Sequence, residues 1–153
     1  VKMEGGREIA DTVKGIIDAG IPVIGHLGLT PQSIHKFGGY GLRAKEESEA
    51  KKLIEDALAL DAAGVSGITL EKVPSALASK VTSMVKAATI GIGAGNETDG
   101  QVLVYADALG MTQGFKPKFL RHFANVNQCM TEGVQEYIKC VTEKSFPSVE
   151  ESY

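Results

Sequence analysis

Apolar and polar positions along the chain follow two periods in alternation. Short apolar runs, typical of buried strands, fall at residues 1–4, 21–26, 65–71, 88–95 and 102–106. Between them stand longer stretches whose apolar residues recur three or four positions apart, as on one face of a helix. Because strands that alternate with helices usually form a parallel sheet, the pattern predicts an α/β fold.

Cap residues indicate where several helices begin and end. The stretch 46–63 has acidic residues in its first turn and Gly64 after its last, which predicts a helix closed by a glycine. Thr30 followed by Pro31 predicts the start of a short helix. Three glycines within FGGYG (37–41) predict a loop after it.

The last predicted helix carries an apolar stripe, which we expect to pack in the core. The stripe consists of Met130, Val134, Tyr137, Ile138 and Val141. We expect the final residues, 145–153, to form a loose tail.

Chain length limits the architecture. A βα unit takes ~30 residues and a closed eight-stranded barrel ~250, so 153 residues hold about five units. The chain therefore forms either an open sheet or the C-terminal part of a barrel. Its first residues, VKMEGG, already alternate as a strand, as if further units preceded them. We expect residues 1–153 to form a single domain.

Composition excludes several classes of protein. Hydrophobic residues make up 43% and charged residues 23%, with a net charge of −3, as in ordinary globular domains. Because the chain carries no excess of basic residues, we expect no nucleic-acid partner. Without a long apolar run or a leader-like start we expect no membrane span and no export signal. Cys129 and Cys140 lie ~16 Å apart on a helix, too far to bridge, and two reduced thiols suggest a cytoplasmic protein.

Ionisable residues gather at the carboxyl ends of three successive predicted strands. Lys2 and Glu4 share one face of the first, His26 ends the second, and Glu71 ends the third with Thr69 on its face. Parallel α/β enzymes place their active sites at this edge. A lysine can bind an anion, one carboxylate can hold a metal or a water, and another can move a proton. These groups together suit chemistry beside a carbonyl group. The alternative is that each is a solvated or merely structural residue.

The glycine loop GIGAGN (91–96) follows a predicted strand. Such a loop lets the backbone approach a ligand, but the glycine spacing is not GxGxxG and no acidic residue stands ~20 positions further on, so we do not expect a dinucleotide site. The alternative is a tight turn that packs closely.

Several of these segments together resemble the ketopantoate hydroxymethyltransferase family over the whole chain. They are VKMEGG, VIGHLGLTPQS, FGGY, DALALDAAG, LEKVP and GIGAGNETDGQVLV. The resemblance implies the C-terminal part of a (β/α)₈ TIM barrel of the phosphoenolpyruvate/pyruvate type. It implies transfer of a one-carbon unit from 5,10-methylenetetrahydrofolate to 3-methyl-2-oxobutanoate, giving 2-dehydropantoate for pantothenate synthesis, with Mg²⁺ as the metal.

The resemblance also implies roles for the strand-end residues. Lys2 would bind the keto acid, Glu4 would lie at the metal site, Glu71 would accept a proton, and His26 would line the substrate pocket. Relatives continue upstream through roughly three more βα units that carry two metal-binding aspartates. We therefore expect a complementary N-terminal segment and a homo-oligomer as partners.

Two other interpretations stay open. The chain could be a catalytically inert fragment that acts only as a folding or assembly module. It could also be the same barrel with lyase chemistry on another 2-oxo acid.

Overall fold

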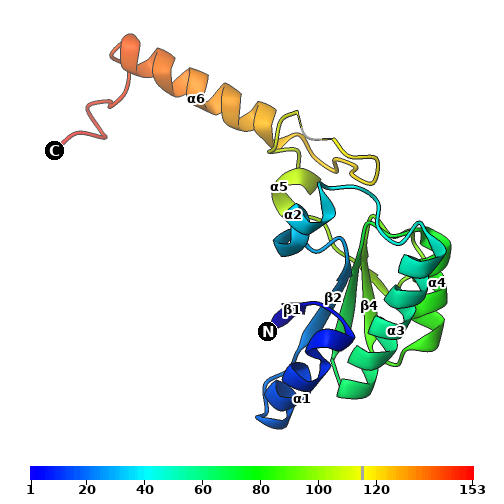
Figure 1. Ribbon diagram of the computed structural model, residues 1–153. Coiled ribbons are helices and arrows are strands. Elements are labelled where there is room, and N and C mark those ends of the chain that lie inside the picture. Colours follow the sequence, from blue (N-terminus) through cyan, green and yellow to red (C-terminus); the bar gives the residue numbers. More distant parts are fainter. Residues whose placement is uncertain (115) are drawn as a thin grey trace. The chain divides into compact units, whose positions relative to one another are not determined.

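A computed structural model describes residues 1–114 and 116–153. It divides into two compact units, Val1–Val102 and Leu103–Tyr153, and each is described by itself. The first unit is built on a parallel sheet whose strands follow one another in chain order (Figure 1). They are β1 (Lys2–Glu4), β2 (Ile24–Gly28), β3 (Gly67–Glu71), β4 (Ala88–Ile92) and β5 (Gly100–Gln101). The predicted α/β class with a parallel sheet is confirmed.

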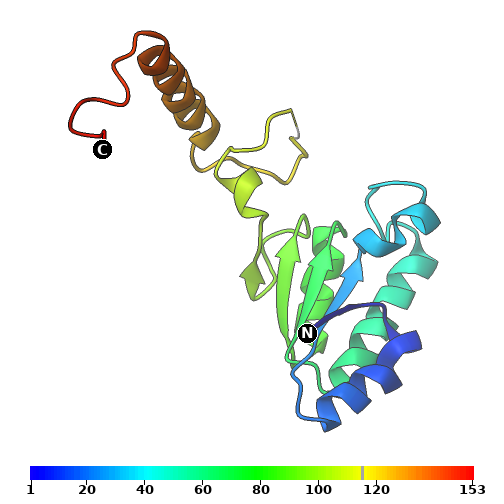
Figure 2. The same cartoon turned by 90° about the vertical axis from the view of Figure 1, so that its left-hand side faces the viewer.

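Three helices of the first unit pack on one face of this sheet (Figure 2). They are α1 (Ala10–Asp18), α3 (Glu47–Ala63) and α4 (Ser75–Met84). The core between helices and sheet includes Val13, Leu60, Ile68, Leu70 and Val81, each at most 1% exposed. Short 3₁₀ turns, Arg7–Ile9 and Pro31–Ser33, precede α1 and the small helix α2 (Ile34–Phe37).

Side-chain alternation along the strands separates this core from the candidate site. Leu27 and Leu70 belong to the core against the helices, so the flanking residues of β2 and β3 point to the opposite face. Glu4 pairs in register with His26, and His26 pairs with Thr69. The strand pairing therefore places side chains from three strands in one row across that face.

The predicted helix ends are confirmed where glycine sets them. Helix α3 stops at Gly64, which adopts the left-handed conformation with φ of 93°. The FGGY loop follows α2, and Gly38 and Gly39 turn it with φ of 70° and 135°. The Thr30–Pro31 start is also confirmed, although it opens a 3₁₀ turn before α2.

The predicted strand 102–106 is wrong. The Val102 amide donates to the Gly91 carbonyl at 3.0 Å and extends the ladder by one bond. The chain then enters α5 (Tyr105–Ala108). A five-residue apolar run fits a strand and a helical turn equally well, so periodicity alone could not decide.

The apolar stripe of α6 (Val126–Thr142) is not core in this chain. Val134 is 58% exposed and Tyr137 57%, and the other three members of the stripe are also exposed. Helical spacing shows which face is apolar but not what covers it. Cys129 and Cys140 lie on the same helix as free thiols. No helix in residues 1–114 or 116–153 is both long and apolar enough to cross a membrane.

Candidate active site

Three ionisable side chains meet where β1, β2 and β3 end. The His26 ring lies between two carboxylates, with Nδ1 3.7 Å from Glu4 Oε1 and Nε2 3.1 Å from Glu71 Oε2. The side chains are 2% exposed for His26, 13% for Glu4 and 18% for Glu71. The structure thus brings together three of the four residues that the sequence singles out.

Both ring nitrogens of His26 are buried without a hydrogen bond in the described part of the chain. Nε2 lies 3.1 Å from Glu71 Oε2 without forming a hydrogen bond to it. Buried polar atoms are nearly always paired, so an unpaired imidazole between two carboxylates is suited to bind a ligand or to pass a proton.

Glu4 is fixed by a contact that the sequence did not reveal. Its Oε2 accepts the backbone N–H of Gln32 at 3.0 Å, which leaves Oε1 facing His26. A backbone amide can come from any residue except proline, so no side-chain pattern marks Gln32 as a partner.

Lys2 lies two residues before Glu4 on the same face of β1, and its side chain is exposed. Among the described residues no ion pair joins it to the His26 cluster. Its ammonium group is therefore available to an anion at the edge of the cluster. Thr69, buried at 7% exposure, lies beside His26 on β3.

Two glycines allow the close packing that positions the carboxylates. A Cβ on Gly6 would lie 2.0 Å from Asp56 Cγ, so the turn after Glu4 can press against α3 only without a side chain. A Cβ on Gly28, whose φ is 89°, would lie 2.2 Å from the carbonyl oxygen of Glu71. The ends of β1, β2 and β3 therefore converge because glycines stand at these positions.

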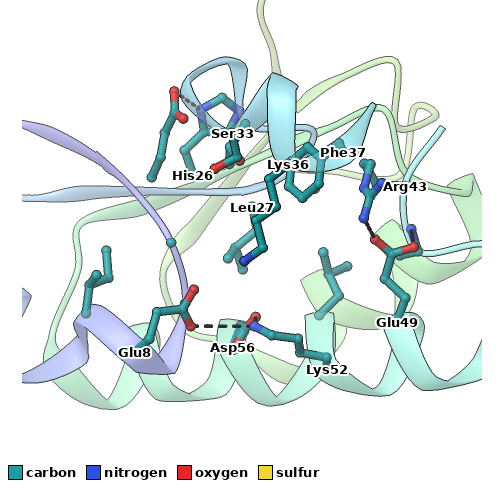
Figure 3. A pocket seen from close by; sticks show the side chains of 18 of the residues that line it. Glu8, His26, Leu27, Ser33, Lys36, Phe37, Arg43, Glu49, Lys52 and Asp56 are labelled. Atoms are coloured by element: carbon teal, nitrogen blue, oxygen red, sulfur yellow. Dashed lines mark hydrogen bonds and ion pairs between the residues drawn. The ribbon is translucent and has the colours of Figure 1, made fainter. Parts of the chain in front are cut away.

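A cleft of about 570 Å³ lies at this end of the sheet, and its lining includes Glu4 and His26 but neither Lys2 nor Glu71. This volume lies within the ~300–1,000 Å³ typical of small-molecule sites. Lys36 extends into it, while His26 and Leu27 point to opposite sides of β2 (Figure 3). The cleft offers room for a ligand next to the strand ends.

Charged pairs form the wall of the cleft. Arg43 pairs with Glu49, and its guanidinium stacks 3.9 Å from the centre of the Phe37 ring. Lys52 pairs with Asp56 and lies 3.5 Å from Glu8. Burial lowers the pKa of Lys52, but these carboxylates outweigh it and raise the pKa above its usual value. Backbone hydrogen bonds, chiefly from its own N–H, lower the pKa of Glu8.

The donor set of the described residues does not by itself match a metal site. No group of three His, Cys, Asp or Glu side chains in residues 1–114 and 116–153 is arranged to hold an ion. Mg²⁺ takes six oxygen ligands, and Glu4 Oε1 and Glu71 Oε2 are two carboxylate oxygens turned toward the centre of the cluster. The predicted role of Glu4 as a metal ligand stays a prediction.

Comparison with known proteins places the chain in a family. The model of the ketopantoate hydroxymethyltransferase family matches residues 1–149. The chain belongs to this family. A 3-methyl-2-oxobutanoate hydroxymethyltransferase of Chlorobium phaeobacteroides is 54% identical over all 153 residues, which cover 55% of its own length. Homologues with the same name from Bacteroides fragilis and from Thermoanaerobacter sp. strain X514 are 54% and 51% identical, with 56% of each covered.

The chain thus spans about half the length of the curated relatives that it matches. The strand-end cluster lies entirely within this half. The family comparison confirms the resemblance drawn from the sequence motifs, whereas the individual roles of Lys2, Glu4, His26 and Glu71 stay predictions.

Proposed function

We propose that this chain carries part of the active site of an enzyme that transfers a hydroxymethyl group to 3-methyl-2-oxobutanoate, giving 2-dehydropantoate. The relatives are named for this reaction. The observation that carries the proposal is the buried His26 ring held between Glu4 and Glu71 beside an open cleft. A carboxylate next to an imidazole suits removal of a proton from a carbon beside a carbonyl group.

In the proposed reaction Glu71 takes the proton from C3 of the keto acid, and the electron pair moves into the enolate. For the donor we propose 5,10-methylenetetrahydrofolate. One water supplies the hydroxyl oxygen as both C–N bonds to the one-carbon unit break, and tetrahydrofolate leaves with its two amines protonated. The enolate carbon forms the new C–C bond to the one-carbon unit, whose oxygen takes back the proton from Glu71. His26 lies 3.1 Å from Glu71 and limits the positions that the carboxylate can take. Lys2 neutralises the carboxylate of the keto acid from the edge of the cluster.

A bound Mg²⁺ would polarise the ketone oxygen. Glu4 is the residue of this chain that we propose as one of its ligands, completed by oxygen donors outside the described residues.

We also propose that the five-stranded sheet is part of a (β/α)₈ barrel of the phosphoenolpyruvate/pyruvate type. Its parallel strands run in chain order, as strands do around such a barrel. A further segment that pairs with the edge strand β1 would then complete the site. In that case the working unit would include this segment, within a homo-oligomer in the cytoplasm.

The proposal is tested by exchange of the C3 hydrogen of 3-methyl-2-oxobutanoate in D₂O, followed by ¹H NMR without the folate. The protein is extended to the full length of its relatives, and Glu71→Gln is compared with wild type. We expect the variant to bind the keto acid but to lose about 10²–10⁴-fold in exchange rate, the usual contribution of a general base. The matched control is Glu97→Gln, an exposed position on the glycine loop that follows β4.

Wild-type exchange rates in Glu71→Gln would refute the role of Glu71, and no exchange in the extended wild type would refute the function. The 153-residue chain is assayed alone in parallel. A folded but inactive chain whose activity returns with the missing segment would place the catalytic centre across both pieces. A chain that stays inactive after the segment is added would favour the alternative of an inert folding module.

A further inference from the structure

The connection between β2 and α3 is fastened to the strand ends that carry both carboxylates. In its first half the Gln32 amide donates to the Glu4 carboxylate, and the Leu29 amide donates to the Glu71 carbonyl at 2.8 Å. Its second half reaches Lys72, whose carbonyl accepts the Arg43 amide at 2.8 Å. The backbone that directly follows the Glu71 side chain is therefore held at two carbonyl groups by this one connection.

Lys72 stands directly after Glu71 in a conformation that residues other than glycine seldom adopt, with φ of 47°. Its amide donates to the Ile92 carbonyl at 2.9 Å, and its ammonium group donates to the carbonyl of Tyr40. Together with the Arg43 amide, these bonds attach Lys72 to β4 and twice to the segment 40–43. A residue keeps a strained backbone conformation where several surrounding contacts hold it there, and such residues cluster at functional sites.

Two glycines stand between α2 and the segment that Lys72 holds. Gly38 and Gly39, with φ of 70° and 135°, separate it from α2. Tyr40 itself is 68% exposed, so no packing of its side chain fastens the segment there. Arg43 also ties this segment to α3 through Glu49, whereas the bonds to Lys72 join it to the end of the strand that carries Glu71.

We propose that Lys72 is a positioning residue of the candidate active site, which holds the β2–α3 connection against the end of β3 and so orients Glu71. This inference rests on the proposed function for its effect on turnover. Lys72 does not touch the substrate. It acts through the backbone of Glu71 and through the loop that also meets Glu4.

The first test measures amide hydrogen exchange on the 153-residue chain by NMR. In Lys72→Met, which keeps the length of the side chain but removes its donor, we expect the Leu29 and Arg43 amides to exchange about three- to tenfold faster. The matched control is Lys80→Met, an exposed lysine on α4. Unchanged protection of both amides in Lys72→Met would overturn the proposal.

A glycine variant separates the side chain from the backbone. Lys72→Gly adopts a φ of 47° without strain but has no ammonium group. If the contact to Tyr40 holds the loop, this variant loosens the same amides as Lys72→Met does. If it protects them as wild type does, the side chain is not the attachment and the proposal fails.

The second test uses the full-length protein and the C3 exchange assay. We expect Lys72→Met to lower kcat about three- to tenfold with KM unchanged, and Lys72→Arg, which can also donate to Tyr40, to restore it. A raised KM with unchanged kcat would mean that Lys72 binds substrate, against the proposal. A wild type without exchange would refute the proposed function, while the amide measurement would still decide the role of Lys72.

Discussion

Replacing Gly6 by alanine tests how the turn after Glu4 is seated on α3. The new methyl carbon would lie 2.0 Å from Asp56 Cγ and 2.3 Å from its Cβ. Asp56 is only 5% exposed, so its side chain has little space to rotate away. Either the turn or the helix must move, and the 3.1 Å bond from the Arg7 amide to Asp56 is then lost.

The expected cost follows from these two effects. Overpacking of a close contact costs ~1–3 kcal/mol, and a lost hydrogen bond of this kind costs about 1 kcal/mol. We therefore expect Gly6→Ala to lower the free energy of unfolding by about 2–4 kcal/mol. At ~2–4 °C per kcal/mol for a chain of this size, Tm falls by roughly 5–15 °C.

The assay is urea unfolding monitored by circular dichroism at 222 nm. An unchanged m-value shows that unfolding exposes the same amount of surface in the variant and in wild type. Gly15→Ala is the matched control, because nothing lies within 4 Å of a Cβ at that position on α1. Alanine in a helix interior is favoured over glycine by ~0.5–1 kcal/mol, so this control is expected to be slightly more stable than wild type.

A second substitution identifies the clashing partner. Asp56→Gly removes all three atoms nearest to the new methyl group, so Gly6→Ala on that background should cost little. The two changes should therefore be non-additive by about 1–3 kcal/mol. Asp56→Ala keeps the Cβ and should give only partial relief. Additive costs with Asp56→Gly, or a Gly6→Ala protein as stable as wild type, would refute the reasoning.

Three further substitutions test one close contact at the carboxyl ends of β2 and β3 and the hydrogen bonds between β4 and the turn before β5. Gly28→Ala forces a Cβ against the carbonyl of Glu71 at a φ of 89°, so we expect ~1–3 kcal/mol of destabilisation in urea and slower C3 exchange in the full-length protein. Thr89→Val removes a hydroxyl that donates to Asp99 at 2.9 Å and contacts Thr82, and should cost about 1–3 kcal/mol, checked by thermal unfolding. Hydrogen bonds from the Thr89 amide and hydroxyl lower the pKa of Asp99 from its usual value. Its stabilisation is fully present above the unfolded-state pKa and is lost as pH falls through the lower folded-state pKa. Asp99→Asn should therefore flatten the acid side of the urea-midpoint profile, and equal acid slopes would contradict this.

Sequence rules were sufficient to predict the structure where a single residue type determines the backbone conformation. The end of α3 at Gly64 was predictable because a left-handed cap strongly favours glycine. The meeting of Glu4, His26 and Glu71 was predictable in the same way. Parallel strands carry their ends to one edge, and alternation then assigns the face.

Other features depend on partners that leave no mark in the sequence. The contact from Gln32 to Glu4 uses a backbone amide, and the attachment of Tyr40 to Lys72 uses a backbone carbonyl. The run 102–106 was too short for its period to separate strand from helix. The stripe on α6 was recognisable as apolar, but its exposure depends on what packs against it.

The strand order has a consequence for how the first unit reaches its fold. Each strand of the sheet pairs with the strand that precedes it along the chain, from β1 to β5. Every new pairing therefore closes only the loop of one βα unit, and loop closure of this length costs little entropy. A chain emerging from the ribosome can add each strand to the edge left by the last one, without waiting for distant residues. The same ordering keeps the mean sequence separation of sheet contacts low, which favours rapid folding for a parallel sheet.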